Sequence, residues 1–147
     1  SPEAAMNPET LFSIANAVAL VGWIILALAP LRRPLAIGAA RTIGVVLAVA
    51  YSTLLIRSLT GGGFEGDLTT LAGLTAAFSR PEAVLVGWVH YLAFDLWVGA
   101  WATEDAGKRS VPHWALVPCL FFILMAGPFG LLLYLATRTI LGRKAAG

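Results

Sequence analysis

The sequence predicts an all-α integral membrane protein, a four-helix bundle with a short interfacial helix between the second and third spans. Hydrophobic residues make up 59% of the chain and charged residues 12%, with a mean hydropathy of +0.82. Because a soluble domain has about 25% charged residues, this composition argues against a water-exposed fold. The second observation is that four apolar segments, each close to the ~20 residues that cross a ~30 Å hydrocarbon layer, are separated by short polar turns. The 147 residues suit one domain, expected at residues 6–147 after a tag remnant at residues 1–5.

The first two spans are predicted to form an antiparallel pair. The first covers residues 11–29, with Thr10 as its N-cap and Pro30 at its end. The basic turn at residues 31–34 is short, so the second span, residues 35–56, should return beside the first. Small residues along the second span allow close helix packing in lipid. They are Gly38, Ala39, Ala40, Gly44, Ala48 and Ala50.

A glycine-rich loop and a short helix connect the second span to the third. The loop, residues 58–67, lacks the lysine and the preceding strand of a phosphate-binding loop. The helix at residues 68–78 carries one apolar stripe and is too short to span, so we expect it to lie flat at the membrane surface. A capping box formed by Ser79 and Glu82 then starts the third span.

The last two spans each contain an irregular feature. The third span, residues 83–102, is apolar except for His90 and Asp95. The fourth, residues 113–135, is interrupted at residues 127–128, a Gly-Pro pair whose missing backbone donor should kink the helix and free carbonyl groups. Both features lie inside the spans, where unpaired polar groups are unfavourable.

Four spans are predicted, and the basic residues do not orient them. Spans one and three start at one membrane face, named face A, and spans two and four start at the opposite face B. Face A then has Arg57, Arg80, Arg138, Arg143 and Lys144. Face B has Arg32, Arg33, Arg41, Lys108 and Arg109. This is a tie under the positive-inside rule.

His90 and Asp95 are the predicted catalytic residues. An ionisable residue inside a spanning helix costs roughly 2.5–3.5 kcal/mol on insertion scales, so it indicates a functional site. A carboxyl group near the midplane without a cationic partner is expected to stay protonated and to act as an acid, and an imidazole suits a base. Their spacing places the two side chains about 140° apart, so both reach one point only across a bend or a wide pocket. A purely structural pair is the alternative.

Polar features of several spans fall near one level. At ~1.5 Å per residue, Asn16, Tyr51 and His90 lie about 8–10 Å below face A, with the Gly-Pro break, and Asp95 lies about 18 Å below it. Glu104 and His113, near face B, are secondary candidates that are more often interfacial residues. A helix–helix hydrogen bond is an alternative role for Asn16, and packing is an alternative for the deep tryptophans. The predicted substrate-binding residues are Asn16, Trp23, Tyr51, Trp88, Tyr91 and Trp97.

Two stretches of the sequence resemble a known family, the small membrane proteins that include plant neoxanthin synthase and are known from abscisic-acid-deficient mutants. They are GWVHYLAFDLWVGAWATEDA and HWALVPCLFFILMAGPFGLLLYLATR. The likeness extends from Thr10 to Arg138, and it is closest to bacterial members, which implies a multi-pass protein of a bacterial inner membrane. Its specific part is the W-x-H-x-x-x-x-D-L core formed by Trp88, His90, Asp95 and Leu96.

The resemblance implies isomerase chemistry. Neoxanthin synthase is implicated in converting a carotenoid epoxide into an allenic alcohol without net redox change, which needs an acid at the epoxide oxygen and a base for the adjacent vinylic proton. We therefore expect an acid–base isomerase without cofactor or metal, whose partners are a carotenoid or other isoprenoid and membrane lipid.

Other function classes stay open. One alternative is a non-catalytic protein that binds a carotenoid or quinone, or scaffolds a pigment complex. Another is a metal-assisted carotenoid oxygenase that uses His90, His113 and a carboxylate. The few, scattered basic residues argue against a nucleic-acid partner. Homo-oligomerisation is compatible with the sequence and is not specified by it.

Overall fold

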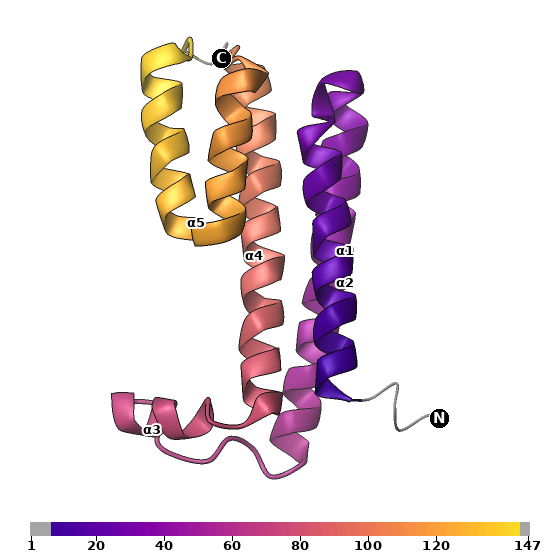
Figure 1. Ribbon diagram of the computed structural model, residues 1–147, viewed down its shortest axis with the longest axis vertical. Helices are drawn as coiled ribbons and strands as arrows, with labels where there is room; N and C mark the ends of the chain where they lie inside the picture. The colour runs from indigo at the N-terminus through magenta and orange to yellow at the C-terminus, as the bar shows by residue number, and fades with distance from the viewer. Residues whose placement is uncertain (1–6, 145–147) are drawn as a thin grey trace.

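The computed structural model describes residues 7–144, so the predicted tag remnant at residues 1–5 and the predicted start at Met6 lie outside the described range. The described residues form helices and no strands, which confirms the all-α class. Four helices are long and apolar enough to cross a membrane, and the chain is an integral membrane protein. The elements are α1 (Pro8–Ala27), the 3-10 helix η2 (Ala29–Leu31), α2 (Arg33–Thr60), α3 (Leu71–Ala77), α4 (Pro81–Lys108) and α5 (His113–Leu141) (Figure 1).

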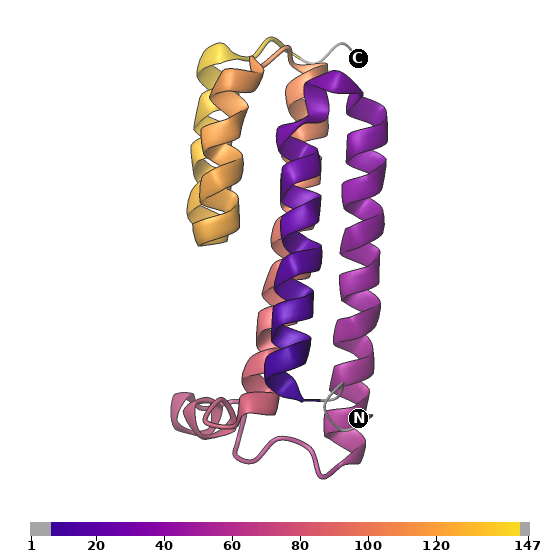
Figure 2. The same cartoon turned by 45° about the vertical axis from the view of Figure 1, so that its right-hand side comes forward.

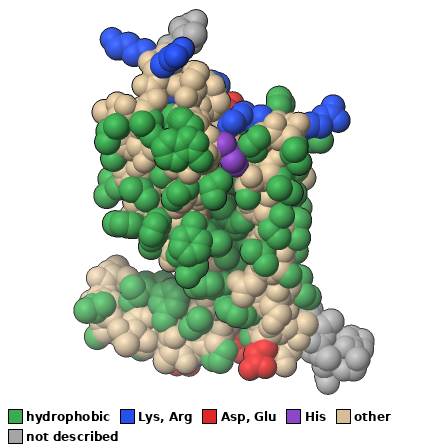
Figure 3. Space-filling model, turned by 45° about the horizontal axis from the view of Figure 1, so that its top comes forward, with side chains coloured by type: hydrophobic (Ala, Val, Ile, Leu, Met, Phe, Trp, Pro, Cys, Tyr) green, Lys and Arg blue, Asp and Glu red, His purple; other side chains and the backbone are tan. Residues whose placement is uncertain are grey.

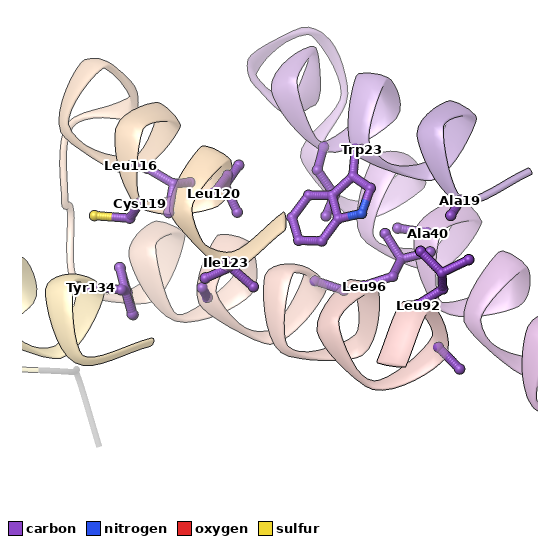
Figure 4. Close-up of a cluster of buried hydrophobic side chains, with 14 of the residues drawn as sticks. Ala19, Trp23, Ala40, Leu92, Leu96, Leu116, Cys119, Leu120, Ile123 and Tyr134 are labelled. Atoms are coloured by element: carbon purple, nitrogen blue, oxygen red, sulfur yellow. The ribbon is translucent and has the colours of Figure 1, made fainter. Parts of the chain in front are cut away.

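Helix α4 runs through the middle of the molecule and contacts α1, α2 and α5. Figures 1 and 2 show α1 and α2 on one side of α4 and the α5 hairpin on the other. Glycines allow this close packing. A Cβ atom at Gly22 would lie 2.7 Å from a methyl carbon of Leu96, and one at Gly99 would lie 2.6 Å from the ring of Trp23. Trp23 and Leu96 are both buried at the centre of this core (Figure 4).

Helix α5 reverses direction near its middle and forms a helical hairpin. Ala126 has a non-helical backbone (φ −152°, ψ 63°), and Pro128 lacks the N–H group that would continue the helix. The two halves run side by side, so Cys119 Sγ lies 3.5 Å from Thr137 Oγ1, 18 residues further along the chain. They approach closely because Gly130 has no side chain, and a Cβ atom there would overlap the backbone of the first half. Both ends of α5 therefore lie where α4 ends (Figures 1 and 2).

The predicted position of the break is confirmed, but the predicted course of the fourth span is wrong. A simple kink would carry the chain end to face A. Instead, the Arg143 N–H donates a 2.7 Å hydrogen bond to the carbonyl oxygen of Arg109 in the α4–α5 turn, at face B. The Arg138 guanidinium lies 3.1 Å from the Asp105 carboxylate, also at face B. Arg138, Arg143 and Lys144 are thus at face B, because contacts with the end of α4 hold the returning half of α5 there.

The segment between α2 and α4 lies at face A. Helix α3 has 7 residues, fewer than predicted, because the Asp67 carboxylate accepts hydrogen bonds from the Thr69 amide (2.9 Å) and hydroxyl (2.6 Å) in the turn that precedes it. These two donors lower the pKa of the exposed Asp67 carboxyl group. Figure 1 shows α3 lying crosswise to the long helices. This is the orientation expected of a helix at the membrane surface.

Candidate functional site

An aromatic and polar cluster lies where α1 meets α4. The Trp88 indole N–H donates a 2.8 Å hydrogen bond to the side-chain oxygen of Asn16, which links the two helices. The Trp88 ring stacks on that of Tyr91, with ring centroids 5.5 Å apart, and contacts Phe12 at 5.6 Å. We name Phe12, Trp88 and Tyr91 the aromatic strip. The strip presents a row of ring faces that leads from the face-A half of the molecule toward its middle.

Asp95 lies one helical turn beyond the aromatic strip, opposite the break in α5. A Cβ atom at Gly127 would lie 3.0 Å from Asp95 Cγ and would overlap the carboxylate, so this approach requires glycine. The Gly127 N–H donates a 3.3 Å hydrogen bond to the Tyr91 hydroxyl, which ties the break in α5 to α4. Asp95 Oδ2 is buried and has no hydrogen-bond partner within residues 7–144. Asp95 is therefore a half-buried carboxyl group in the membrane interior with an available oxygen.

Two hollows open on the surface of the molecule, and one of them adjoins the aromatic strip. A groove between the beginnings of α1 and α4 includes Phe12, which also belongs to the strip, and Val84, one turn before Trp88. Figure 3 shows an indentation with hydrophobic side chains on both sides between the α5 hairpin and the α3 segment. An apolar molecule dissolved in the hydrocarbon layer can therefore approach the strip from the side. The groove is lined by Pro8, Glu9, Phe12, Ser13, Ser79, Pro81, Val84 and Leu85.

His90 lies on a different side of α4 from Asp95. Its ring is exposed, 5.4 Å from the ring of Tyr51 on α2 and 4.9 Å from that of Phe94. The structure therefore brings the two predicted residues His90 and Tyr51 together. Because five residues correspond to about 140° around a helix, His90 faces α2 whereas Asp95 faces the tip of α5. The two predicted catalytic groups do not share one space.

The remaining predicted tryptophans differ in their surroundings. Trp23 is 6% exposed and packs against Gly99, so it belongs to the core. Trp97 is exposed, lies against Gly44, and has the Arg41 guanidinium 5.8 Å from its ring centroid. Within residues 7–144, neither Trp23 nor Trp97 forms a ring contact or hydrogen bond with the aromatic strip. The groove residues are thus separate from these two rings.

Glu104 and His113 lie near face B, as predicted. The Glu104 carboxylate pairs with the Arg41 guanidinium and lies 3.3 Å from Lys108 Nζ. His113 Nε2 lies 2.8 Å from the carbonyl oxygen of Ala27, which joins the start of α5 to the end of α1. These contacts give both residues a role in holding helix ends together.

The residues needed for a metal-assisted reaction are not brought together. Within residues 7–144, no three His, Cys, Asp or Glu side chains are grouped so that they could hold a metal ion. His90 lies beside Tyr51, and His113 lies at the beginning of α5 against Ala27. The metal-assisted oxygenase alternative therefore lacks its ligand set among the described residues.

Sequence reasoning missed two members of the site, Phe12 and Gly127. Phe12 precedes Asn16 by four residues and so shares its side of α1, which is a detectable pattern. The sequence indicates Gly127 as part of a helix break, but its contact with Asp95 depends on the reversal of α5. The Gly-Pro pair alone predicts a break and does not predict the angle between the two halves.

These features define a class of protein, a small all-α integral membrane protein with a carboxyl group halfway along its central helix and an aromatic strip beside it. The family follows from a direct comparison. The chain belongs to the ABA DEFICIENT 4-like family, whose model matches residues 10–134. The predicted family resemblance is thereby confirmed, and the matched range includes the whole aromatic strip and Asp95. No match was found among curated proteins or among solved structures.

Proposed function

We propose that the protein is a membrane isomerase that carries out acid–base chemistry on a carotenoid or another isoprenoid lipid, without a cofactor. The observation that carries this proposal is the position of Asp95. At the end of the aromatic strip and beside the break in α5, its carboxyl group has a buried oxygen without a hydrogen-bond partner among residues 7–144. Membership of the ABA DEFICIENT 4-like family, which is linked to carotenoid pathways, supports the choice of substrate class.

The aromatic strip is suited to a conjugated, apolar chain. Flat rings such as those of Trp88 and Tyr91 offer large apolar surfaces with few rotatable bonds. The hydrogen bond from Trp88 to Asn16 fixes the orientation of the indole ring. A polyene entering from the hydrocarbon layer would lie along the strip and place its polar end group at Asp95.

One carboxyl group can perform both proton transfers. Protonated Asp95 gives its proton to the epoxide oxygen as the carbon–oxygen bond breaks, and the resulting cation is delocalised over the polyene. The Asp95 carboxylate then removes the adjacent vinylic proton, and the electron pair of that C–H bond forms the second double bond of the allene. The acid is regenerated, and no oxidant or reductant is needed. Ring faces of Trp88 and Tyr91 would stabilise the cation, since aromatic faces attract positive charge.

Asp95→Asn tests this proposal directly. The amide keeps the shape of the side chain and cannot supply the proton, so turnover of a carotenoid epoxide in lipid vesicles should fall by at least ~100-fold, measured by chromatographic separation of substrate and product. Glu104→Gln is the matched control, because it makes the same carboxyl-to-amide change at face B. Unchanged turnover in Asp95→Asn, with unchanged helicity, would disprove the proposal.

A second candidate function is binding of a pigment without chemistry, and the stacked pair Trp88–Tyr91 favours it. It makes a different prediction. Wild-type protein would hold one unaltered polyene per chain without forming product over time, and Asp95→Asn would bind the polyene equally well. Absorption spectra of the purified protein, together with the turnover assay, separate the two functions.

A further inference from the structure

The hairpin form of α5 changes how many times the chain crosses the membrane. Helices α1, α2 and α4 run the full length of the molecule, whereas both ends of α5 lie at face B (Figures 1 and 2). The first half of α5, from His113 to Ala126, is about 21 Å long at ~1.5 Å per residue, which is about two-thirds of a ~30 Å hydrocarbon layer. The chain thus has three complete crossings and one hairpin that enters from face B and returns to it.

The reversal also redistributes the charges. Among residues 7–144, face A keeps two basic residues, Arg57 and Arg80, together with the acidic residues Glu9, Glu65, Asp67 and Glu82. Face B gains the three basic residues of the returning half of α5 and beyond. It then has Arg32, Arg33, Arg41, Lys108, Arg109, Arg138, Arg143 and Lys144, against Glu104 and Asp105. The tie found for four crossings becomes a strong asymmetry.

Several of these cations are available to molecules outside the protein. Arg41, Lys108, Arg109 and Arg138 pair with the two carboxylates of face B. Arg32, Arg143 and Lys144 are exposed and form no ion pair within the described part of the chain. Figure 3 shows Lys and Arg side chains projecting at this end of the molecule and acidic side chains at the opposite end. The exposed cations lie at the level expected for lipid headgroups.

We propose that face B lies on the cytoplasmic side of the membrane, where its basic residues contact the headgroups of anionic lipids, and that face A lies on the opposite side. The positive-inside rule counts Lys and Arg near the ends of spans, and the ten basic residues lie in the turns between or after the long helices or in the helix turns next to them. Anionic lipids of the cytoplasmic leaflet attract basic residues next to the membrane. The inference is independent of the proposed function, because it uses only the course of the chain and its charges.

Variants with one added cysteine test the crossings and the orientation. Glu65→Cys marks the loop at face A, Ser110→Cys marks the α4–α5 turn, and Lys144→Cys marks the end of the described chain. Wild-type protein, whose Cys119 is buried, is the blank. A membrane-impermeant maleimide is added to right-side-out and to inverted vesicles from a bacterial inner membrane. We expect Glu65→Cys to react from the outside and the other two variants to react only in inverted vesicles.

Each alternative gives a different labelling pattern. Reaction of Lys144→Cys on the same side as Glu65→Cys would overturn the three-crossing topology. Reaction of Ser110→Cys and Lys144→Cys from the outside, with Glu65→Cys inside, would overturn the orientation. Equal reaction of one site from both sides would show mixed insertion and would also contradict the proposal.

A vesicle experiment tests the lipid contact. A donor fluorophore on Ser110→Cys is combined with acceptor-labelled phosphatidylglycerol or, in parallel, acceptor-labelled phosphatidylcholine. Energy transfer to the anionic lipid should exceed transfer to the neutral lipid by about twofold at low salt and should decline as salt is added. Adding Arg143→Gln and Lys144→Gln should weaken this preference, whereas Arg80→Gln at face A should not. Equal transfer to both lipids would overturn the contact.

Discussion

The Tyr134 hydroxyl donates a 2.7 Å hydrogen bond to the Asp105 carboxylate, and this contact joins the returning half of α5 to the end of α4. The same carboxylate lies 3.1 Å from the guanidinium groups of Arg109 and Arg138. Tyr134 is fully buried, and its ring meets Trp101 edge-on at 5.7 Å. The hairpin therefore has an ionic and aromatic attachment at face B, which determines where the tip of α5 meets Asp95.

Asp105→Asn should lower the free energy of unfolding by about 2–3 kcal/mol, because it weakens charge-assisted hydrogen bonds of a carboxylate that is 14% exposed. The measurement is reversible unfolding in mixed micelles, followed by circular dichroism. Glu104→Gln is the control, since its carboxylate is 31% exposed and its pairs should contribute less than ~1 kcal/mol. Equal losses in the two variants would contradict the attachment.

Tyr134→Phe should cost about 1–2 kcal/mol, because it removes the hydroxyl while keeping the buried ring. The double variant with Asp105→Asn should lose less stability than the two single changes predict together, since both act on one hydrogen bond. Strict additivity in this double-mutant cycle would show that the two side chains are not coupled.

Gly127→Ala should reduce turnover by about tenfold, because its Cβ atom would push against the Asp95 carboxylate and overpacking of this kind costs about 1–3 kcal/mol. Gly38→Ala is the matched control. A Cβ atom there meets nothing within 4 Å, and the change should be neutral or slightly stabilising in an exposed helix position. Full activity in Gly127→Ala would show that the close approach of Gly127 to Asp95 is not needed for turnover.

Asn16→Ala should raise KM for a polyene substrate by about two- to tenfold and leave kcat within about twofold, because the loss of one hydrogen bond frees the Trp88 ring without touching Asp95. Steady-state kinetics in vesicles with a series of substrate contents provide the comparison. Ser52→Ala, at an exposed position of α2, serves as the control. A fall in kcat with unchanged KM would be inconsistent with a positioning role for Asn16.

His90→Gln should retain at least about a third of wild-type turnover, because His90 faces Tyr51 and Phe94 rather than Asp95. The result decides between one carboxyl group that acts in both steps and the predicted pair of acid and base. A loss of ~100-fold, comparable to Asp95→Asn, would identify His90 as the base and would contradict the single-carboxyl mechanism.

Much of the architecture follows from composition and spacing. Long apolar runs bounded by prolines and basic turns correctly predict four long helices. The hydrogen bond between α1 and α4 was among the predicted alternatives for Asn16. The long helices depend on residues close together in the sequence, which makes them accessible to periodicity and hydropathy.

The course of α5 was not accessible in this way. Gly127 and Pro128 interrupt the helix, but the direction of the second half depends on contacts with Asp105. Its partners Tyr134 and Arg138 lie 29 and 33 residues further along the chain. The separation of His90 from Asp95 has a similar origin. Their angle around α4 was predictable, whereas the identity of the helix facing each side chain depends on packing across the whole molecule.

The half-depth hairpin gives the protein unequal widths in the two leaflets. On the face-B side, α1, α2, α4 and both halves of α5 occupy the hydrocarbon region, each segment about 10 Å wide. On the face-A side only α1, α2 and α4 continue through it, and α3 lies crosswise at the boundary. The molecule is therefore wedge-shaped, displaces more acyl chains from one monolayer than from the other, and should concentrate where the membrane curves to match it.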